Sequence, residues 1–177
     1  GNYYEMYDLP SQWESCGLAS NTEKYYCYDV GNIHFVCLNS EWSPWIYVPV
    51  ASEMALWLTA DLQATDKKFK LVYFHQPPYS KGSHDSDDPF GIMNMFRQNI
   101  IPLVELGGAD LVISGHSHCY ERSYLINGHY GYSSFYNENL HLIQGGTGNL
   151  SLGEEYYKKD NGVGVRGTIY NVVGNSG

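Results

Sequence analysis

The fold of this chain is decided by the stretch Ala109–His118, ADLVISGHSH, in which a short apolar segment leads into a glycine and two histidines. The apolar segment predicts a buried β-strand, and Gly115 allows the backbone to turn sharply where that strand ends. Open α/β sheets place their ligand sites at the carboxyl ends of strands, and imidazole is the commonest protein ligand for transition metals. The stretch therefore predicts a strand that presents two candidate metal ligands, His116 and His118.

A second apolar segment ends in the same way. Leu71–Phe74 is followed by His75, and the prolines after it stop a strand and fix the loop. A single His-x-His pair is weak evidence for a metal. If the two strands lie parallel in one sheet, however, His75, His116 and His118 reach the same edge, and three convergent imidazoles indicate a metal site.

The rest of the chain alternates between strands and helices and then continues with strands alone. A hairpin is expected from Tyr25 to Asn39 about the turn Gly31-Asn32, with Cys27 opposite Val36. Ser52 is the expected N-cap of a helix with one apolar face. The other expected elements are a strand at Lys70–Phe74, a helix from Ile92 to Leu106 that Pro102 kinks, and strands at Tyr120–Ile126, near Leu140–Gln144 and at Thr168–Val173. This order predicts an α/β (α+β) fold, half of an αββα sandwich with mixed sheets.

Several motifs together resemble one protein family. Phe74–Tyr79 and Gly115–Arg122 resemble the last two metal-binding motifs of the purple acid phosphatases, a branch of the calcineurin-like metallophosphoesterases. Further similar segments are Glu53–Leu62, Tyr79–His84, Ser123–Gly128 and Gly167–Gly174. The resemblance implies part of a four-layer αββα sandwich. It also implies hydrolysis of phosphate monoesters at a binuclear centre of iron with zinc, manganese or iron, where a metal-bound hydroxide attacks phosphorus.

The same resemblance assigns roles to individual residues. It implies a second-metal site built from Asn2, His75 and His116, with His118 on the first metal. The candidate proton donor on the substrate side is His84, nine residues after His75; the alternative is an exposed loop histidine.

Three further residues surround these candidates. Tyr79 is expected either to line the substrate pocket or to be a structural tyrosine. Glu121 and Arg122 are expected to pair with each other and to orient the histidine loop.

In the order of the family, the first two motifs, Asp-x-Gly and Gly-Asp-x-x-Tyr, would precede Gly1, and Tyr3 stands where the family has a histidine. We therefore expect residues 1–177 to be a single partial catalytic domain, truncated at its start and continuing beyond its end. Such a chain should hold at most one metal and be inactive alone. A binding or structural protein with a degraded metal centre is the alternative, and a phosphodiesterase is the alternative within the enzyme class.

The composition excludes some classes of binding partner. The chain has 177 residues and a formal charge of -9, which argues against nucleic acid or an anionic membrane as the main partner. No apolar run is long enough to span a membrane, and a homo-oligomer or larger assembly remains open.

Three features favour a secreted protein. The chain has 17 tyrosines, and the sequon at Asn149 is a candidate glycosylation site. Cys16 and Cys27 flank a polar segment and are the expected disulfide, because Cys37 should point to the opposite sheet face from Cys27. A three-residue hairpin loop would reverse that preference.

Overall fold

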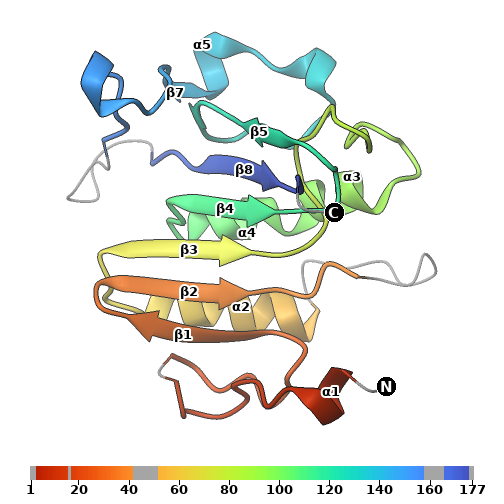
Figure 1. Ribbon diagram of the computed structural model, residues 1–177, viewed down its shortest axis with the longest axis vertical. Coiled ribbons are helices and arrows are strands. Elements are labelled where there is room, and N and C mark those ends of the chain that lie inside the picture. The colour runs from red at the N-terminus through yellow and green to blue at the C-terminus, as the bar shows by residue number, and fades with distance from the viewer. Residues whose placement is uncertain (1–2, 16, 42–51, 158–165, 176–177) are drawn as a thin grey trace.

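The structure is a computed structural model that describes residues 3–15, 17–41, 52–157 and 166–175. Its main feature is a six-stranded sheet (Figure 1). The order across this sheet is β1 (Tyr26–Val30), β2 (Ile33–Cys37), β3 (Phe69–Tyr73), β4 (Leu111–Ser114), β8 (Ile169–Val173) and β5 (Tyr120–Arg122). The four central strands are parallel, and the edge strands β1 and β5 run antiparallel to their neighbours. The predicted mixed α/β architecture is thus confirmed.

Shorter elements complete the described chain. A two-stranded sheet joins β6 (Leu125–Ile126) and β7 (Leu142–Gln144). The helices are α1 (Tyr3–Met6), α2 (Glu53–Ala64), α3 (Ile92–Asn99), α4 (Ile101–Leu106) and α5 (Glu138–His141), with 3-10 turns at Ser133–Phe135 and Leu150–Leu152. In the described part of the chain, no helix is long and apolar enough to cross a membrane.

The hairpin and the first long helix follow the sequence prediction. Strands β1 and β2 pair with Cys27 opposite Val36, in the register that a two-residue turn requires. Helix α2 begins at Ser52, whose hydroxyl accepts a hydrogen bond from Ala55 N at 3.3 Å. The expected apolar face of α2 is buried through Met54, Leu58 and Leu62.

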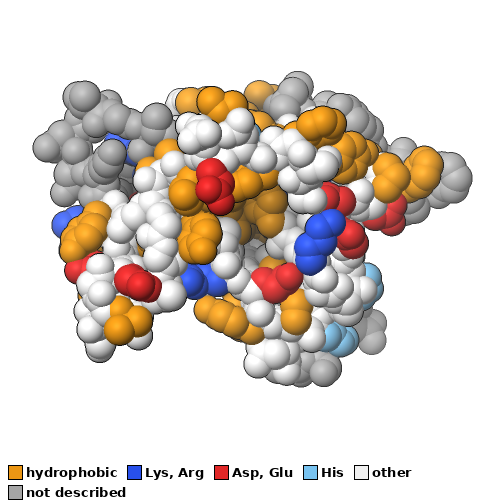
Figure 2. Space-filling model, turned by 90° about the horizontal axis from the view of Figure 1, so that it is seen from above, with side chains coloured by type: hydrophobic (Ala, Val, Ile, Leu, Met, Phe, Trp, Pro, Cys, Tyr) orange, Lys and Arg blue, Asp and Glu red, His pale blue; other side chains and the backbone are white. Residues whose placement is uncertain are grey.

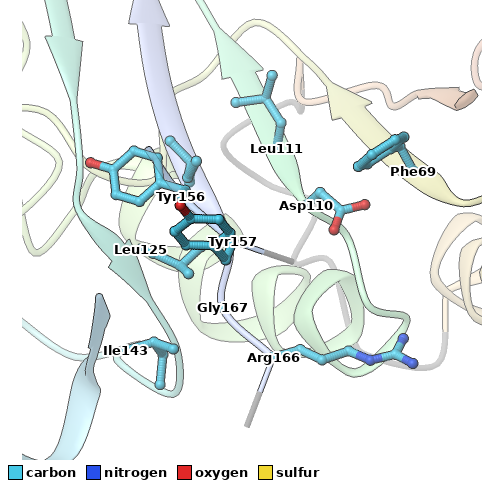
Figure 3. Close-up of a pocket in the computed structure, with 10 residues that line it drawn as sticks. Phe69, Asp110, Leu111, Leu125, Ile143, Tyr156, Tyr157, Arg166 and Gly167 are labelled. Carbon is cyan, nitrogen blue, oxygen red and sulfur yellow. The ribbon is translucent and has the colours of Figure 1, made fainter. Parts of the chain in front are cut away.

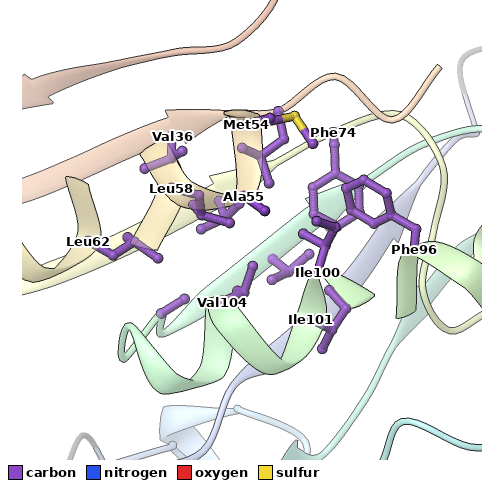
Figure 4. Packing of buried hydrophobic residues seen from close by; sticks show 14 of the residues in the cluster. Val36, Met54, Ala55, Leu58, Leu62, Phe74, Phe96, Ile100, Ile101 and Val104 are labelled. Carbon is purple, nitrogen blue, oxygen red and sulfur yellow. The ribbon is translucent and has the colours of Figure 1, made fainter. Parts of the chain in front are cut away.

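Helices α2 and α4 lie on the same face of the sheet, behind the strands in Figure 1. Their side chains pack against the inward-facing residues of β2, β3 and β4, as Figure 4 shows. The largest members of this core are fully buried: Leu58, Leu62, Val72, Phe96, Ile100 and Val112. Burying each such side chain contributes about 1.5–3 kcal/mol, so this layer fixes the positions of the strand ends.

The opposite face of the sheet is apolar but less protected. Alternate residues such as Tyr28, Phe35, Leu71 and Ile113 point to this side, and each stays partly exposed, whereas Cys27, Val36, Val72 and Val112 on the other side are buried. None of the described helices that pack on the core covers this face (Figure 1). A partly exposed apolar sheet face of this kind is typical of a sheet that packs against another layer.

Three predicted elements differ from the structure. The strand expected at Tyr120–Ile126 is two strands, because Ser123 Oγ accepts a hydrogen bond from Tyr170 N at 2.9 Å and ends the pairing with β8. Leu140 lies in α5 rather than in the strand that follows. The helix expected at Ile92–Leu106 breaks at Ile100, since Pro102 has no N–H for an intrahelical bond and sits in the first turn of α4.

Candidate metal centre

The carboxyl ends of β3 and β4 bring two histidines together. These strands are parallel neighbours, and both arrows point toward the same edge in Figure 1. Just beyond the strands, Gly115 N donates to the carbonyl of His75 at 3.0 Å. As a result, His75 Nε2 and His116 Nδ1 lie 3.1 Å apart. The predicted convergence of the two motifs is therefore seen in the structure.

His84 joins the same cluster from the loop after β3. Its ring centroid lies 4.1 Å from that of His116, and Ser83 Oγ lies 3.2 Å from His84 Nδ1. Both His75 and His84 are exposed, whereas His116 is half-buried. Figure 2 shows histidine side chains at one edge of the molecule, open to solvent and near acidic and basic groups.

His118 takes a separate position. In extended backbone, His116 and His118 would project the same way, because they are two residues apart. His116 has a φ of 61°, however, and the loop bends there. His118 is exposed, and its backbone N donates to Ser83 Oγ at 3.0 Å. It remains close enough that its charge contributes to the lowered pKa of His116.

The electrostatics of the cluster favour a neutral imidazole at its centre. Burial lowers the pKa of His116 below its usual value, and the charges of His84 and His75 lower it further. Glu41 opposes this shift, with Oε1 lying 4.0 Å from His75 Nε2. Because metals bind the neutral form of histidine, His116 is prepared for ligation near neutral pH.

The donor set fits part of a transition-metal site. Two imidazole nitrogens that converge from different loops match the ligands preferred by zinc and iron, and the Glu41 carboxylate is the nearest acidic group to His75. Asn2, the further ligand expected for this site, lies outside the described residues. His75 and His116 are therefore the described residues of this edge that could contribute metal ligands.

Glu121 orients the histidine loops, but not through Arg122. Its carboxylate accepts hydrogen bonds from Ser80 Oγ at 2.6 Å and from Lys81 N at 2.9 Å. Arg122 instead contacts Tyr156, over whose ring its guanidinium lies. The expected pair does not form, because adjacent residues of β5 point to opposite faces.

Tyr79 packs among Tyr170, Arg97 and His129. Its ring lies 4.6 Å from that of Tyr170, Arg97 lies over it at 5.5 Å, and its hydroxyl donates to the carbonyl of His129. Burial raises the pKa of its hydroxyl well above the usual value. These contacts support the structural alternative for Tyr79.

A second group of potential ligands lies in the core. Among the described residues, Cys27, His34 and Asp61 have ligand atoms within 4.8 Å of one another. These atoms are already bonded to each other: His34 Nε2 lies 2.7 Å from Asp61 Oδ2, and Cys27 Sγ lies 3.1 Å from Asp61 Oδ1. His34 Nδ1 also lies 2.7 Å from Asp29 Oδ1. We call Cys27, Asp29, His34 and Asp61 the core cluster, a network of hydrogen bonds that also reaches the backbone of Leu18 and the side chain of Lys67.

The two predicted modification sites are not decided by the structure. Cys16 lies outside the described residues, so its pairing with Cys27 stays a prediction. Asn149 is exposed, with its side-chain oxygen accepting a hydrogen bond from Ser151 N at 2.9 Å. Its glycosylation also stays a prediction.

A pocket at the other end of the sheet is unrelated to the histidines. Its lining includes Phe69, Leu111 and Ile169, the first residues of three parallel strands, together with Leu125 and Tyr156 (Figure 3). Ligand sites in open α/β sheets lie at the opposite, carboxyl ends. We therefore assign this pocket no role in the chemistry.

Comparison with known proteins identifies the family. The model of the calcineurin-like phosphoesterases matches residues 1–120, about two thirds of the chain. This chain belongs to the calcineurin-like phosphoesterase family. Within that family it is similar to purple acid phosphatase 18 of Arabidopsis thaliana, with 32% identity over 133 residues, 70% of this chain and 28% of the relative.

Two further matches agree with a place among the purple acid phosphatases. Purple acid phosphatase 23 of Arabidopsis thaliana is 28% identical over 165 residues, which cover 91% of this chain and 32% of that protein. The structure of purple acid phosphatase PPD1 from yellow lupin (Lupinus luteus) seeds has the same fold, with a TM-score of 0.59 and 21% identity over 90% of this chain and 24% of that chain. The chain thus spans about a third or less of the length of these relatives.

Two residues of the site were not predicted from the sequence. Glu41 follows β2 and approaches His75 only because β2 and β3 are parallel neighbours. Ser117, between the two histidines, is fully buried and bonded to the His84 loop. A small hydroxyl residue inside a histidine motif is the sequence signal that could have drawn attention to it.

Proposed function

We propose that this chain carries the histidine part of a purple acid phosphatase-like hydrolase of phosphate monoesters. The observation that carries this proposal is the 3.1 Å approach of His75 Nε2 and His116 Nδ1 at the carboxyl ends of two parallel strands. We infer that these two nitrogens hold one divalent metal ion. In this proposal Asn2 would complete the site and His118 would serve the neighbouring metal, in a centre of iron with zinc, manganese or iron.

His84 is the proposed substrate-side group. A metal bound at this centre supplies positive charge for phosphate oxygens and lowers the pKa of coordinated water. His84 lies against His116 and is exposed to solvent, so a phosphate group at the metal would be within its reach. Because Nδ1 faces Ser83 Oγ, we assign Nε2 the role of donating a proton to the leaving-group oxygen.

The cellular setting belongs to the same proposal. A secreted protein would explain the sequon at Asn149, where the side chain is exposed, and would allow Cys16 and Cys27 to form a disulfide. The phosphate monoester remains the proposed substrate class. The acidic net charge supports a partner other than nucleic acid or an anionic membrane surface.

Zinc titration of the chain tests the proposal. We expect one Zn²⁺ per chain, with affinity lost in His116→Ala. His118→Ala is the matched control from the same motif and should keep most of the affinity. Elemental analysis that finds two ions per chain, or equal binding by His116→Ala and the unaltered chain, would contradict the proposed site.

The chain alone should not turn over a chromogenic phosphate ester, because it has no Gly-Asp-x-x-Tyr, one of the two aspartate motifs of the family. A steady-state assay with added Zn²⁺ or Mn²⁺ checks this expectation. Metal-dependent turnover that disappears in His116→Ala would show that the described residues suffice for catalysis, contrary to our proposal.

A further inference from the structure

We propose that Ser117, between the two motif histidines, is the positioning residue that holds His84 in place to contact phosphate. This inference rests on the proposed function of the histidine cluster. Ser117 is 0% exposed, in contrast to the exposed His118 that follows it. Its side chain points into the protein, where it bonds to the loop that carries His84.

The hydroxyl of Ser117 is bonded to both backbone groups of His84. His84 N donates to Ser117 Oγ at 3.0 Å, and Ser117 Oγ lies 3.1 Å from the His84 carbonyl oxygen as a donor. A single side-chain oxygen therefore fixes the peptide units on both sides of the His84 Cα. Since the side-chain direction follows from the backbone, this contact sets where the imidazole lies relative to His116.

A second hydroxyl connects Ser117 to Glu121. Ser117 Oγ lies 2.7 Å from Ser80 Oγ, which in turn lies 2.6 Å from Glu121 Oε2. A carboxylate can only accept, so the Ser80 proton lies on the bond to Glu121. Ser117 then shares its one proton between Ser80 Oγ and the His84 carbonyl. Hydrogen bonds therefore connect Glu121, Ser80, Ser117 and His84 in sequence.

The surroundings leave no room for another arrangement. A Cβ placed on Gly174 would lie 2.0 Å from the Ser117 carbonyl oxygen, and a Cβ on Gly82 would lie 3.1 Å from Ser117 Oγ. The backbone thus encloses Ser117 from two sides. If the hydroxyl were removed, the part-buried His84 N–H would lose its partner in the protein.

Phosphate binding and amide exchange test this role. Ser117→Ala removes the hydroxyl, and Ser114→Ala is the matched control, because Ser114 is also buried but bonds to the carbonyl of Asn171. On chain loaded with one equivalent of Zn²⁺, we expect Ser117→Ala to weaken inorganic phosphate binding about tenfold, because His84 would no longer be held in place to contact phosphate. Zinc affinity should change by less than about threefold. General destabilisation of the chain would not weaken phosphate binding while leaving zinc binding nearly unchanged.

Two comparisons locate the effect at His84. In a His84→Ala background, Ser117→Ala should weaken phosphate binding no further. In the metal-free chain, the His84 amide should exchange its hydrogen faster in Ser117→Ala than in Ser114→Ala. Unchanged phosphate affinity in Ser117→Ala, an equal further loss in the His84→Ala background, or unchanged exchange at His84 would each overturn the positioning role.

Failure of the proposed function gives a different pattern. In that case His116→Ala would bind zinc as the unaltered chain does, or His84→Ala would bind phosphate normally. Either result removes the site that Ser117 is proposed to support. Normal zinc and His84-dependent phosphate binding without an effect of Ser117→Ala contradicts only the role of Ser117.

Discussion

His116 and His34 both lie next to other ionisable groups, but their neighbours carry opposite charges. His116 is surrounded by His75, His84 and His118, and its pKa is lowered by burial and by the charges of these rings. His34 is fully buried between Asp29 and Asp61. Burial alone would lower the pKa of His34, yet its hydrogen bonds to Asp61 and Asp29 outweigh that effect and raise it.

The difference shows how neighbours decide what a histidine can do. An imidazole that donates from both nitrogens to carboxylates is held as a cation and joins the elements that supply those carboxylates. His34 in this way links β1, β2 and α2. An imidazole among other imidazoles is kept neutral, with its lone pair available for a metal. His75, His84 and His116, which we call the exposed cluster, are therefore prepared for metal ligation, whereas the core cluster stabilises the fold.

Replacing the two histidines should separate these roles most clearly. We expect His34→Ala to lower the free energy of unfolding by about 3–5 kcal/mol, because Asp61 would remain buried without its charged partner. His116→Ala, at the more open site, should change it by about 0.5 kcal/mol or less. Urea unfolding followed by circular dichroism measures both. Similar losses in the two variants would mean that the clusters do not differ as described.

Zinc should stabilise the chain through the exposed cluster alone. At a free Zn²⁺ concentration 100 times the dissociation constant, the expected gain is about 2.7 kcal/mol, and removal of the metal with a chelator should reverse it. The gain should vanish in His116→Ala. Differential scanning calorimetry with and without zinc provides the measurement, and stabilisation that survives in His116→Ala would point to a site elsewhere.

Stability should fall as pH rises through the raised pKa of His34. In the unfolded chain the imidazole has a pKa near 6.5, and in the folded protein its pKa is higher. The charged form therefore contributes fully to the free energy of unfolding below pH 6.5, and this contribution is lost as the pH rises above the pKa of the folded state. Each unit between the two pKa values is worth about 1.4 kcal/mol. Urea unfolding between pH 6 and pH 9 measures the slope. His34→Gln cannot titrate, so its free energy of unfolding should lack this fall with pH. An unchanged pH dependence in that variant would contradict the raised pKa of His34.

The smallest effect is expected at Glu41, the carboxylate beside His75. Glu41 and His75 approach to 4.0 Å, but their side chains are 64% and 54% exposed. Solvent screens such a pair, so Glu41→Gln should alter the free energy of unfolding by less than about 0.5 kcal/mol. A loss above about 1 kcal/mol on urea unfolding would show that this edge is less open than its exposure indicates.

The sequence predicted the parts of both clusters that depend on strand geometry. The turn at Gly31-Asn32 sets the hairpin register, which places Asp29 opposite His34. The apolar segments before His75 and His116 predicted two strands, and the parallel pairing that the structure shows brings their ends to one edge. These features follow from local sequence because turn type and strand period fix them.

Other features required the folded structure. Asp61 reaches His34 only when α2 packs on the sheet, so the core cluster could not be predicted from the sequence. The backbone at His116 has a φ of 61°, which breaks the expected alternation and separates His116 from His118. The bond from Ser117 to His84 likewise joins residues 33 positions apart in two irregular loops. Contacts between loops depend on tertiary packing rather than on periodicity.

The most direct test of the account is the identity of the atoms around a bound metal. X-ray absorption spectroscopy on the chain with one equivalent of Zn²⁺ reports the ligands themselves. We predict nitrogen and oxygen neighbours at about 2.0–2.1 Å with the multiple-scattering signature of imidazole, and their loss in His116→Ala. A zinc–sulfur distance of about 2.3 Å that persists in His116→Ala and disappears in Cys27→Ser would place the metal in the core cluster and contradict the account.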